Sequence, residues 1–323
     1  MRYRKAARLP APLSEIGYGM WGMGGWSGSD DAESARALDR AVELGCTFFD
    51  TAWAYGEGRS ERLLGELRRR HRGATVTLAS KVPPKNLRWP GRATSPADEV
   101  FPYEHVISYT EATLDNLGVE TLDLQQLHVW DDSWTDANGW RDAVEDLKRT
   151  GKIRAFGISV NRWEPQNVLR VLETRIVDAV QVVYNVFDQA PEDVLFPACQ
   201  RLGVAVIARV PFDEGSLTGT LRADSRWPEG DWRNIYFAPP HLAETLPRVE
   251  AVARDADTFG VSLPELALRF ILSHPAVTTT IPGMRRVAHV EANIAAGARG
   301  PLSRDALAAL RRHRWDRVPD GRP

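Results

Sequence analysis

The chain alternates short β-prone runs with amphipathic helical patterns along its length. Several helical patterns end in glycine directly before a β-prone run, which is typical of loops that join a helix to the next strand. Strands separated by helices pair in parallel through right-handed crossovers. The patterns predict helices at residues 31–45, 60–70, 105–118, 140–151, 191–203 and 262–273. They predict eight strands, at residues 13–21, 47–52, 75–81, 122–128, 153–159, 179–185, 204–210 and 277–283.

Eight such units in 323 residues favour an α/β fold of the (β/α)8 TIM-barrel type over an open doubly wound sheet. The open sheet needs a glycine-rich phosphate loop after its first strand and an acidic residue after its second. The segment 17–25, GYGMWGMGG, is rich in glycine, but no acid follows at that spacing. We therefore expect a single domain over residues 1–323, with long loops at 82–103 and 211–241 on the C-terminal face.

Charge and composition narrow the class of protein. A net charge of -2 and 43% apolar residues are typical of a soluble globular protein and offer no basic surface for nucleic acid. The sequence has no run of 18 apolar residues and no apolar stretch after its basic start, which predicts neither a membrane span nor a signal peptide. Cys46 and Cys199 are expected to be buried free thiols rather than a disulfide or metal ligands. A cytoplasmic enzyme that acts on a small molecule fits these features.

Four polar residues follow three consecutive strands, at the end of a barrel where catalytic groups lie. Asp50 ends the second strand and Tyr55 follows it, Lys81 ends the third, and His128 ends the fourth. Singly, each has an ordinary explanation: a turn cap, a packed ring, a surface lysine or a structural histidine. Their joint occurrence on one face predicts an active site.

The four residues also make chemical sense together. A phenol has a pKa of about 10, and a nearby ammonium lowers that pKa by stabilising the phenolate. Lys81 can supply the ammonium, Asp50 can pair with the buried Lys81, and His128 can hydrogen-bond to a reacting carbonyl oxygen. This arrangement predicts a proton donor to an alkoxide formed by hydride addition. The histidines show no spacing typical of metal ligands, so we expect no metal site.

These residues resemble the catalytic tetrad of the aldo-keto reductases. The surrounding segments FFDTAWAYGEGRSERLLGE, ASK, LQQLH, FGIS, QVVYN and TTTIPG also match in family order, from about residue 16 to residue 296. The resemblance implies a (β/α)8 barrel that binds NAD(P)H in extended form. It implies that Tyr55 is the proton donor and that His128 orients the substrate carbonyl.

The resemblance also implies cofactor contacts. Ser159 and Gln181 would hold the nicotinamide carboxamide, Tyr184 would stack on the ring, and Asn293 would reach the adenine. Backbone N–H groups near Gly283, at the start of a helix, suit a phosphate. Guanidinium groups suit phosphate oxygens, so NADP(H) is expected rather than NAD(H). The remaining expected cofactor contacts are Trp21, Arg209, Arg285, with Arg286 beside it, and His289.

Three positions depart from the family pattern, and one of them is His289, which stands where glutamine or a similar polar residue is common. Val160 stands where the family has asparagine, and Asn161 follows one place later. Arg209 ends the seventh strand, where it can contact the cofactor, bind a substrate anion, or pair with Asp213 and Glu214 in the next loop. The sequence leaves these alternatives open.

Most of the 11 tryptophans fall in or beside loops of the C-terminal face. Tryptophan offers a large apolar surface with one hydrogen-bond donor, which suits bulky rings or sugars. We expect Trp21, Trp53 and Trp130 to line the substrate pocket, although packing of the long loops is the simpler explanation for several of the others. Segment 227–237 is a candidate lid.

The predicted function is NADPH-dependent reduction of an aldehyde or ketone, or oxidation of the matching alcohol. The alternative is a cofactor-binding regulatory or redox-sensing subunit with little turnover. A metal-dependent barrel hydrolase is a third class, for which the sequence lacks ligands.

Overall fold

A computed structural model of the chain describes residues 1–26, 28 and 30–317. Eight parallel strands run in the order β10-β9-β8-β7-β6-β5-β4-β3. Parallel bridges join Ile16 to Thr280 and Gly19 to Gly283, so the first and last strands close the sheet into a barrel. The predicted fold class is confirmed. The strands are β3 (Tyr18–Gly19), β4 (Phe48–Asp50), β5 (Thr77–Val82), β6 (Leu122–Leu127), β7 (Ile153–Ser159), β8 (Ala179–Val183), β9 (Ala205–Arg209) and β10 (Val277–Thr280).

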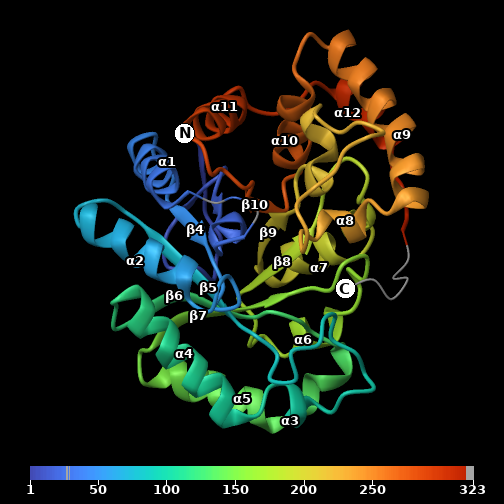
Figure 1. Cartoon of the computed structure of the whole chain (residues 1–323). Coiled ribbons are helices and arrows are strands. Elements are labelled where there is room, and N and C mark those ends of the chain that lie inside the picture. The colour runs from blue at the N-terminus through green and yellow to red at the C-terminus, as the bar shows by residue number, and fades with distance from the viewer. Residues whose placement is uncertain (27, 29, 318–323) are drawn as a thin grey trace.

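The helices lie around the outside of the strands (Figure 1). Capping follows the sequence: Asp30 accepts a hydrogen bond from Glu33 N at the start of α1, and Gly118 ends α4 in the left-handed conformation. The helices are α1 (Asp31–Glu43), α2 (Arg59–Arg70), α3 (Ala97–Val100), α4 (Tyr103–Leu117), α5 (Asn138–Arg149), α6 (Leu169–Glu173), α7 (Leu195–Leu202), α8 (Arg233–Tyr236), α9 (Pro239–Thr258), α10 (Leu263–Ser273), α11 (Val287–Ala298) and α12 (Arg304–Arg311). Short 3₁₀ turns are η1 (Trp21–Met23), η2 (Asp132–Asp136), η3 (Ala190–Glu192) and η4 (Asp213–Thr218).

A cluster of buried apolar side chains fills the interior of the barrel. Alternate residues of the strands point inward, and many of them are alanines that leave room for a few larger side chains such as Phe48 and Ile207. The antiparallel pair β1 (Tyr3–Arg4) and β2 (Leu13–Ser14) adds Leu13 to this cluster. Because the interior is filled, ligands can enter the barrel only near the rim, where the loops begin.

The structure corrects three sequence expectations. Run 13–21 is not one strand, because it divides into β2, which pairs with β1, and β3, which joins the barrel. The 20-residue helix α9 was not predicted; Pro239 and Pro240 open it and Pro247 lies inside it, which weakens the helical pattern. The expected loops contain α3, η4 and α8.

Two expectations about cysteine and membrane association can be compared with the structure. Cys46 and Cys199 are buried and free, as predicted. Within the described residues, no helix combines the length and apolarity needed to cross a bilayer.

Candidate active site

A buried lysine–aspartate pair lies at the C-terminal end of the barrel. Lys81 Nζ donates to Asp50 Oδ1 at 2.5 Å, to Thr51 O at 2.7 Å and to Tyr55 Oη at 3.4 Å. The Lys81 side chain is 0% exposed and that of Asp50 is 2% exposed. The three predicted residues therefore meet, and all three hydrogen atoms of the ammonium have acceptors.

Two glutamines hold the second carboxylate oxygen of Asp50. Gln126 Nε2 on β6 and Gln181 Nε2 on β8 donate to Asp50 Oδ2 at 3.0 and 2.8 Å. Gln126 was missed from the sequence, although its place two residues before His128 gives it the same strand face. The glutamines fix the Asp50 carboxylate, and so fix the position of Lys81.

Burial and charge set the protonation states of the site. Burial by itself lowers the pKa of Lys81, but the charge of Asp50, the Tyr55 oxygen and the hydrogen bonds to both raise it above its ordinary value. Burial raises the pKa of the Tyr55 phenol, and this effect exceeds the lowering by Lys81. The net direction corrects the expectation that Lys81 makes the phenol more acidic than usual. Tyr55 is therefore protonated at neutral pH and can act as a donor.

His128 lies beside the phenol as a neutral imidazole. Its ring centroid is 5.7 Å from that of Tyr55, with the two rings nearly perpendicular. Burial, Lys81 and Arg209 lower the pKa of His128 well below its ordinary value. Nδ1 is buried and has no hydrogen-bond partner among the described residues. The neutral imidazole of His128 and the neighbouring phenol of Tyr55 together suit the binding of an uncharged carbonyl oxygen.

Tryptophans border the Tyr55–His128 pair. Trp26 lies edge-on to Tyr55, with ring centroids 6.3 Å apart, and Trp89 lies edge-on to His128 at 5.9 Å. Trp21 is 42% exposed and contacts Trp26, with centroids 5.4 Å apart. Of these three tryptophans, only Trp21 was predicted to contact a ligand, since nothing periodic marks the loops that carry the other two.

Arg209 adds a second cation, besides Lys81, at the mouth of the barrel, which is the C-terminal end of its strands. Its Nη2 donates to Val160 O at 3.0 Å, and its Nε is buried without a partner among the described residues. Burial and the like charge of Arg162 lower the pKa of Arg209 to about 10, so it remains charged at neutral pH. Glu214, one of its expected partners, pairs with Arg162 instead.

The segment after β10 carries the expected phosphate-binding groups. Gly283 is exposed, and an added side chain there would meet nothing within 4 Å. Arg285 packs across Gly22, where a Cβ would come within 2.8 Å of Arg285 Cδ, so a larger residue at position 22 would displace the Arg285 side chain. Burial, Arg233 and Arg286 lower the pKa of Arg285. Several positive groups therefore lie near one another here, which favours the binding of an anion.

The sequence model of the aldo/keto reductase family matches residues 15–314. The chain belongs to the aldo/keto reductase family. Aldo-keto reductase YhdN of Bacillus subtilis is 28% identical over 301 residues, which are 90% of this chain and 87% of that protein.

Two solved structures of family members resemble this one. Aldo-keto reductase AKR11C1 from Bacillus halodurans, in its holo form, has a TM-score of 0.77 at 26% identity, over 99% of this chain and 98% of that one. An aldo/keto reductase from Klebsiella pneumoniae, in complex with NADP and acetate, has a TM-score of 0.69 at 27% identity, over 96% and 95% of the two chains. This aldo/keto reductase is therefore an oxidoreductase.

The predictions that Tyr184 stacks on the nicotinamide ring and that Trp130 lines the substrate pocket of the reductase are wrong. Tyr184 is 1% exposed, donates to Glu192 Oε1 at 2.7 Å and packs on Phe196, so it lies in the helix layer and not over the mouth. Trp130 is 0% exposed and packs edge-on to Trp140, with centroids 5.2 Å apart, so it does not line a pocket. Tyr184 directly follows β8, on the outward-facing side of that strand.

The other expected contacts have defined positions. Ser159 is buried at the end of β7, and Asn293 is buried on α11. Trp53 is half-buried against Tyr109 of α4, with centroids 4.8 Å apart. His289, also on α11, is exposed. These four residues remain predictions as ligand contacts.

Asn161 joins the loop after β5 to the end of β7. Its Nδ2 donates to Gly91 O at 3.0 Å, and its Oδ1 accepts from Gly91 N at 3.3 Å. With both amide atoms engaged by the backbone, Asn161 does not stand in for the asparagine that Val160 replaces.

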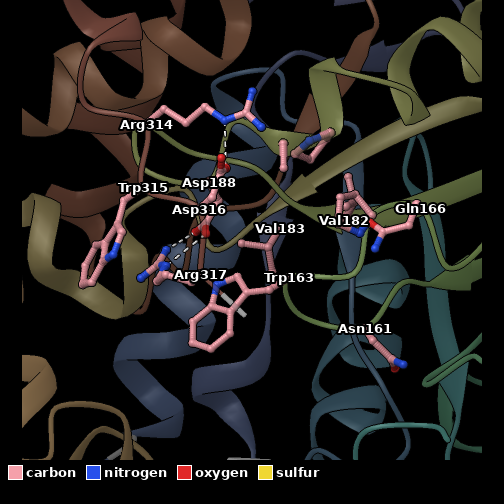
Figure 2. A pocket seen from close by; sticks show the side chains of 13 residues that line it. Asn161, Trp163, Gln166, Val182, Val183, Asp188, Arg314, Trp315, Asp316 and Arg317 are labelled. Atoms are coloured by element: carbon pink, nitrogen blue, oxygen red, sulfur yellow. Dashed lines mark hydrogen bonds and ion pairs between the residues drawn. The ribbon is translucent and has the colours of Figure 1, made fainter. Parts of the chain in front are cut away.

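A hollow of about 120 Å³ lies beside the mouth, between the ends of β7 and β8 and the C-terminal segment (Figure 2). Arg317 closes one side: it pairs with Asp188 and, at 2.9 Å, with Asp213. The C-terminal segment is thereby tied to the loops after β8 and β9.

Proposed function

We propose that this enzyme reduces the carbonyl group of an aldehyde or ketone with NADPH, or oxidises the matching alcohol with NADP. The observation that carries the proposal is the buried Lys81 ammonium, which hydrogen-bonds both Asp50 and the Tyr55 phenol next to a neutral His128. A phenol held in this way is suited to donating one proton to one oxygen atom.

Each of the four residues has a separate role in the proposed reaction. Tyr55 donates its proton to the carbonyl oxygen as negative charge develops there, and Lys81 stabilises the phenolate that remains. Asp50 keeps Lys81 charged, and His128 donates a hydrogen bond that orients the carbonyl. The hydride for the carbonyl carbon would come from NADPH when it is bound.

The donor set near α11 fits a phosphate-bearing cofactor. Arg285, Arg286 and His289 lie at the start of this 12-residue helix, whose first N–H groups carry partial positive charge. Ser159 and Trp21 are proposed contacts at the nicotinamide end, and Asn293 at the adenine. Gln181 already donates to Asp50, so we propose that it supports the nicotinamide side through that contact. The Klebsiella pneumoniae relative was solved with NADP, which supports NADP(H) over NAD(H).

The experiment that tests the proposal follows NADPH absorbance with a panel of aldehydes and ketones that includes sugars and polycyclic ketones. Oxidation of NADPH that depends on the carbonyl compound supports it. If NADPH binds but no compound is turned over, the regulatory alternative is favoured. The substrate panel also selects the compound for the variants described below.

Arg285→Gln is expected to weaken NADPH binding by about 10- to 100-fold, because hydrogen bonds to charged groups contribute about 1.5–3 kcal/mol. NADH, which lacks the 2′-phosphate, should lose little affinity. Calorimetry with both cofactors makes the comparison. Arg299→Gln, an exposed arginine at the other end of α11, is the matched control. Equal losses for NADH and NADPH would contradict a 2′-phosphate contact.

His289 should make NADPH binding depend on pH. Burial, Arg286 and Arg285 lower the pKa of free His289, whereas a bound phosphate would raise it. Protonation is then coupled to binding, so NADPH should bind more tightly at pH 6 than at pH 8. The phosphate titrates too, so His289→Gln is measured in parallel. The same pH ratio in both proteins would remove the proposed contact.

A further inference from the structure

Two glutamines lie directly above the apolar cluster that fills the barrel. Leu124 of β6 and Ala179 of β8 belong to that cluster. Gln126 and Gln181 stand two residues further along these strands, so alternation places both on the same inward face. Gln126 is 0% exposed and Gln181 is 2% exposed. The two amides therefore lie between the filled interior and the mouth, where the cofactor is proposed to bind.

Gly157 gives the Gln126 side chain room to cross the strand that separates the two glutamines. It lies opposite Gln126 in the pairing of β6 with β7, and β7 stands between β6 and β8. A Cβ on Gly157 would come within 3.0 Å of Gln126 Cγ and of Ala179 O. Because glycine leaves that space open, Gln126 reaches over β7, and its Oε1 accepts from Gln181 Nε2 at 3.3 Å.

Asp50 determines which way both amides face. Its carboxylate pairs with the Lys81 ammonium, and an ionised carboxylate can only accept hydrogen bonds. Gln126 Nε2 and Gln181 Nε2 therefore turn toward Asp50 Oδ2, to which they donate at 3.0 and 2.8 Å. This orientation leaves Gln126 Oε1 as the acceptor for the second N–H of Gln181.

Both hydrogen atoms of Gln181 Nε2 are thereby used, one by Asp50 and one by Gln126. Gln181 can then offer a ligand only its carbonyl oxygen, Oε1. An acceptor held in this way selects a ligand group that brings an N–H donor, such as the amino group of a carboxamide. A ligand without that donor would leave the acceptor without a partner, which costs binding free energy.

We propose that Gln126 is a positioning residue that fixes Gln181 as the hydrogen-bond acceptor for the amino group of the nicotinamide carboxamide. This inference rests on the proposed function, in which NADP(H) is the cofactor. Gln126 acts through Gln181 and Asp50 and not through a contact of its own with the cofactor. Without Gln126, one N–H of Gln181 is released, and the amide can turn that N–H toward the ligand in place of its oxygen.

The test compares NADP with its 3-acetylpyridine analogue, in which a methyl group replaces the amino group of the carboxamide. Calorimetry of the wild-type enzyme should give a Kd about fivefold lower for NADP, the size of one neutral hydrogen bond. Gln126→Met keeps the length of the side chain without its amide, and should bring the two Kd values within about twofold of each other. Gln126→Glu should keep the difference, because its carboxyl group and that of Asp50 share one proton and an oxygen remains to accept from Gln181.

Gln125→Met is the matched control. Gln125 is the neighbouring glutamine on β6, is 1% exposed, and has neither amide atom engaged by the described residues. Alternation turns its side chain to the opposite face of the strand. This variant should therefore keep the wild-type preference for NADP.

Equal Kd values for the two cofactors in the wild type overturn the inference alone, because NADP still binds and the proposed function stands. An unchanged preference in Gln126→Met, or the same loss of preference in Gln125→Met, also overturns it. If NADP does not bind the wild type, the proposed function and the inference fail together. Urea unfolding checks that each variant is folded, and Gln126→Leu takes the place of a methionine variant that is not.

Discussion

Replacing Tyr55 with phenylalanine is expected to lower kcat for carbonyl reduction by about 10²- to 10⁴-fold, the usual contribution of general acid catalysis. The substitution removes only the oxygen that lies 3.4 Å from Lys81 Nζ, so the ring should keep its packing against Trp26 and His128. NADPH binding should not change. Steady-state rates and a cofactor titration provide the two measurements.

Tyr3→Phe is the control for this substitution. The Tyr3 hydroxyl donates to Gly45 O at 3.0 Å, near the N-terminal pair of strands. Its loss should leave turnover unchanged. If Tyr55→Phe retained near-normal turnover, another group would have to supply the proton, and the assignment of Tyr55 would be wrong.

Asp50→Asn is expected to lower the free energy of unfolding by about 3–5 kcal/mol, the typical cost of breaking a buried ion pair by removing one partner. The Lys81 charge would remain fully buried without a counter-ion, and the two glutamines would face an amide in place of a carboxylate. Turnover should also fall sharply. Urea unfolding at neutral pH measures the change in stability.

The double variant Asp50→Asn with Lys81→Met separates charge from packing. It removes both charges, so it should regain much of the stability that Asp50→Asn loses while remaining inactive. The pKa of Lys81 is raised above its value in an unfolded chain, so its contribution to stability is complete at neutral pH. That contribution is lost only when the pH rises through the folded value, above about 10.4. A double variant as unstable as Asp50→Asn would contradict the role of the charge.

The tetrad could be predicted from the sequence because strand ends in a barrel converge on one face. Asp50, Lys81 and His128 each occupy such an end, and the structure brings Asp50, Tyr55 and Lys81 into hydrogen-bond contact. The pKa of Tyr55 was harder to predict, because its net direction depends on how much burial outweighs Lys81. That balance depends on the tertiary structure.

Tyr184 shows an error that the sequence itself could have corrected. Gln181 points inward to Asp50, so strict alternation turns the side chain three residues later outward, into the helix layer. Trp26 and Trp89 had no comparable signal, because they lie in loops without a repeating pattern. Helix α9 was not predicted, because its prolines interrupt the helical pattern of the sequence.

The burial of Lys81 has a consequence for chemical labelling. The chain has only five lysines: Lys5, Lys81, Lys85, Lys148 and Lys152. Lys5 and Lys85 are exposed, and Lys148 and Lys152 are partly exposed, whereas the Lys81 amine is fully buried and donates to three oxygen atoms. Amine-reactive dyes or surface-immobilisation reagents should therefore attach at the other four and spare the amine on which the Tyr55 proton depends.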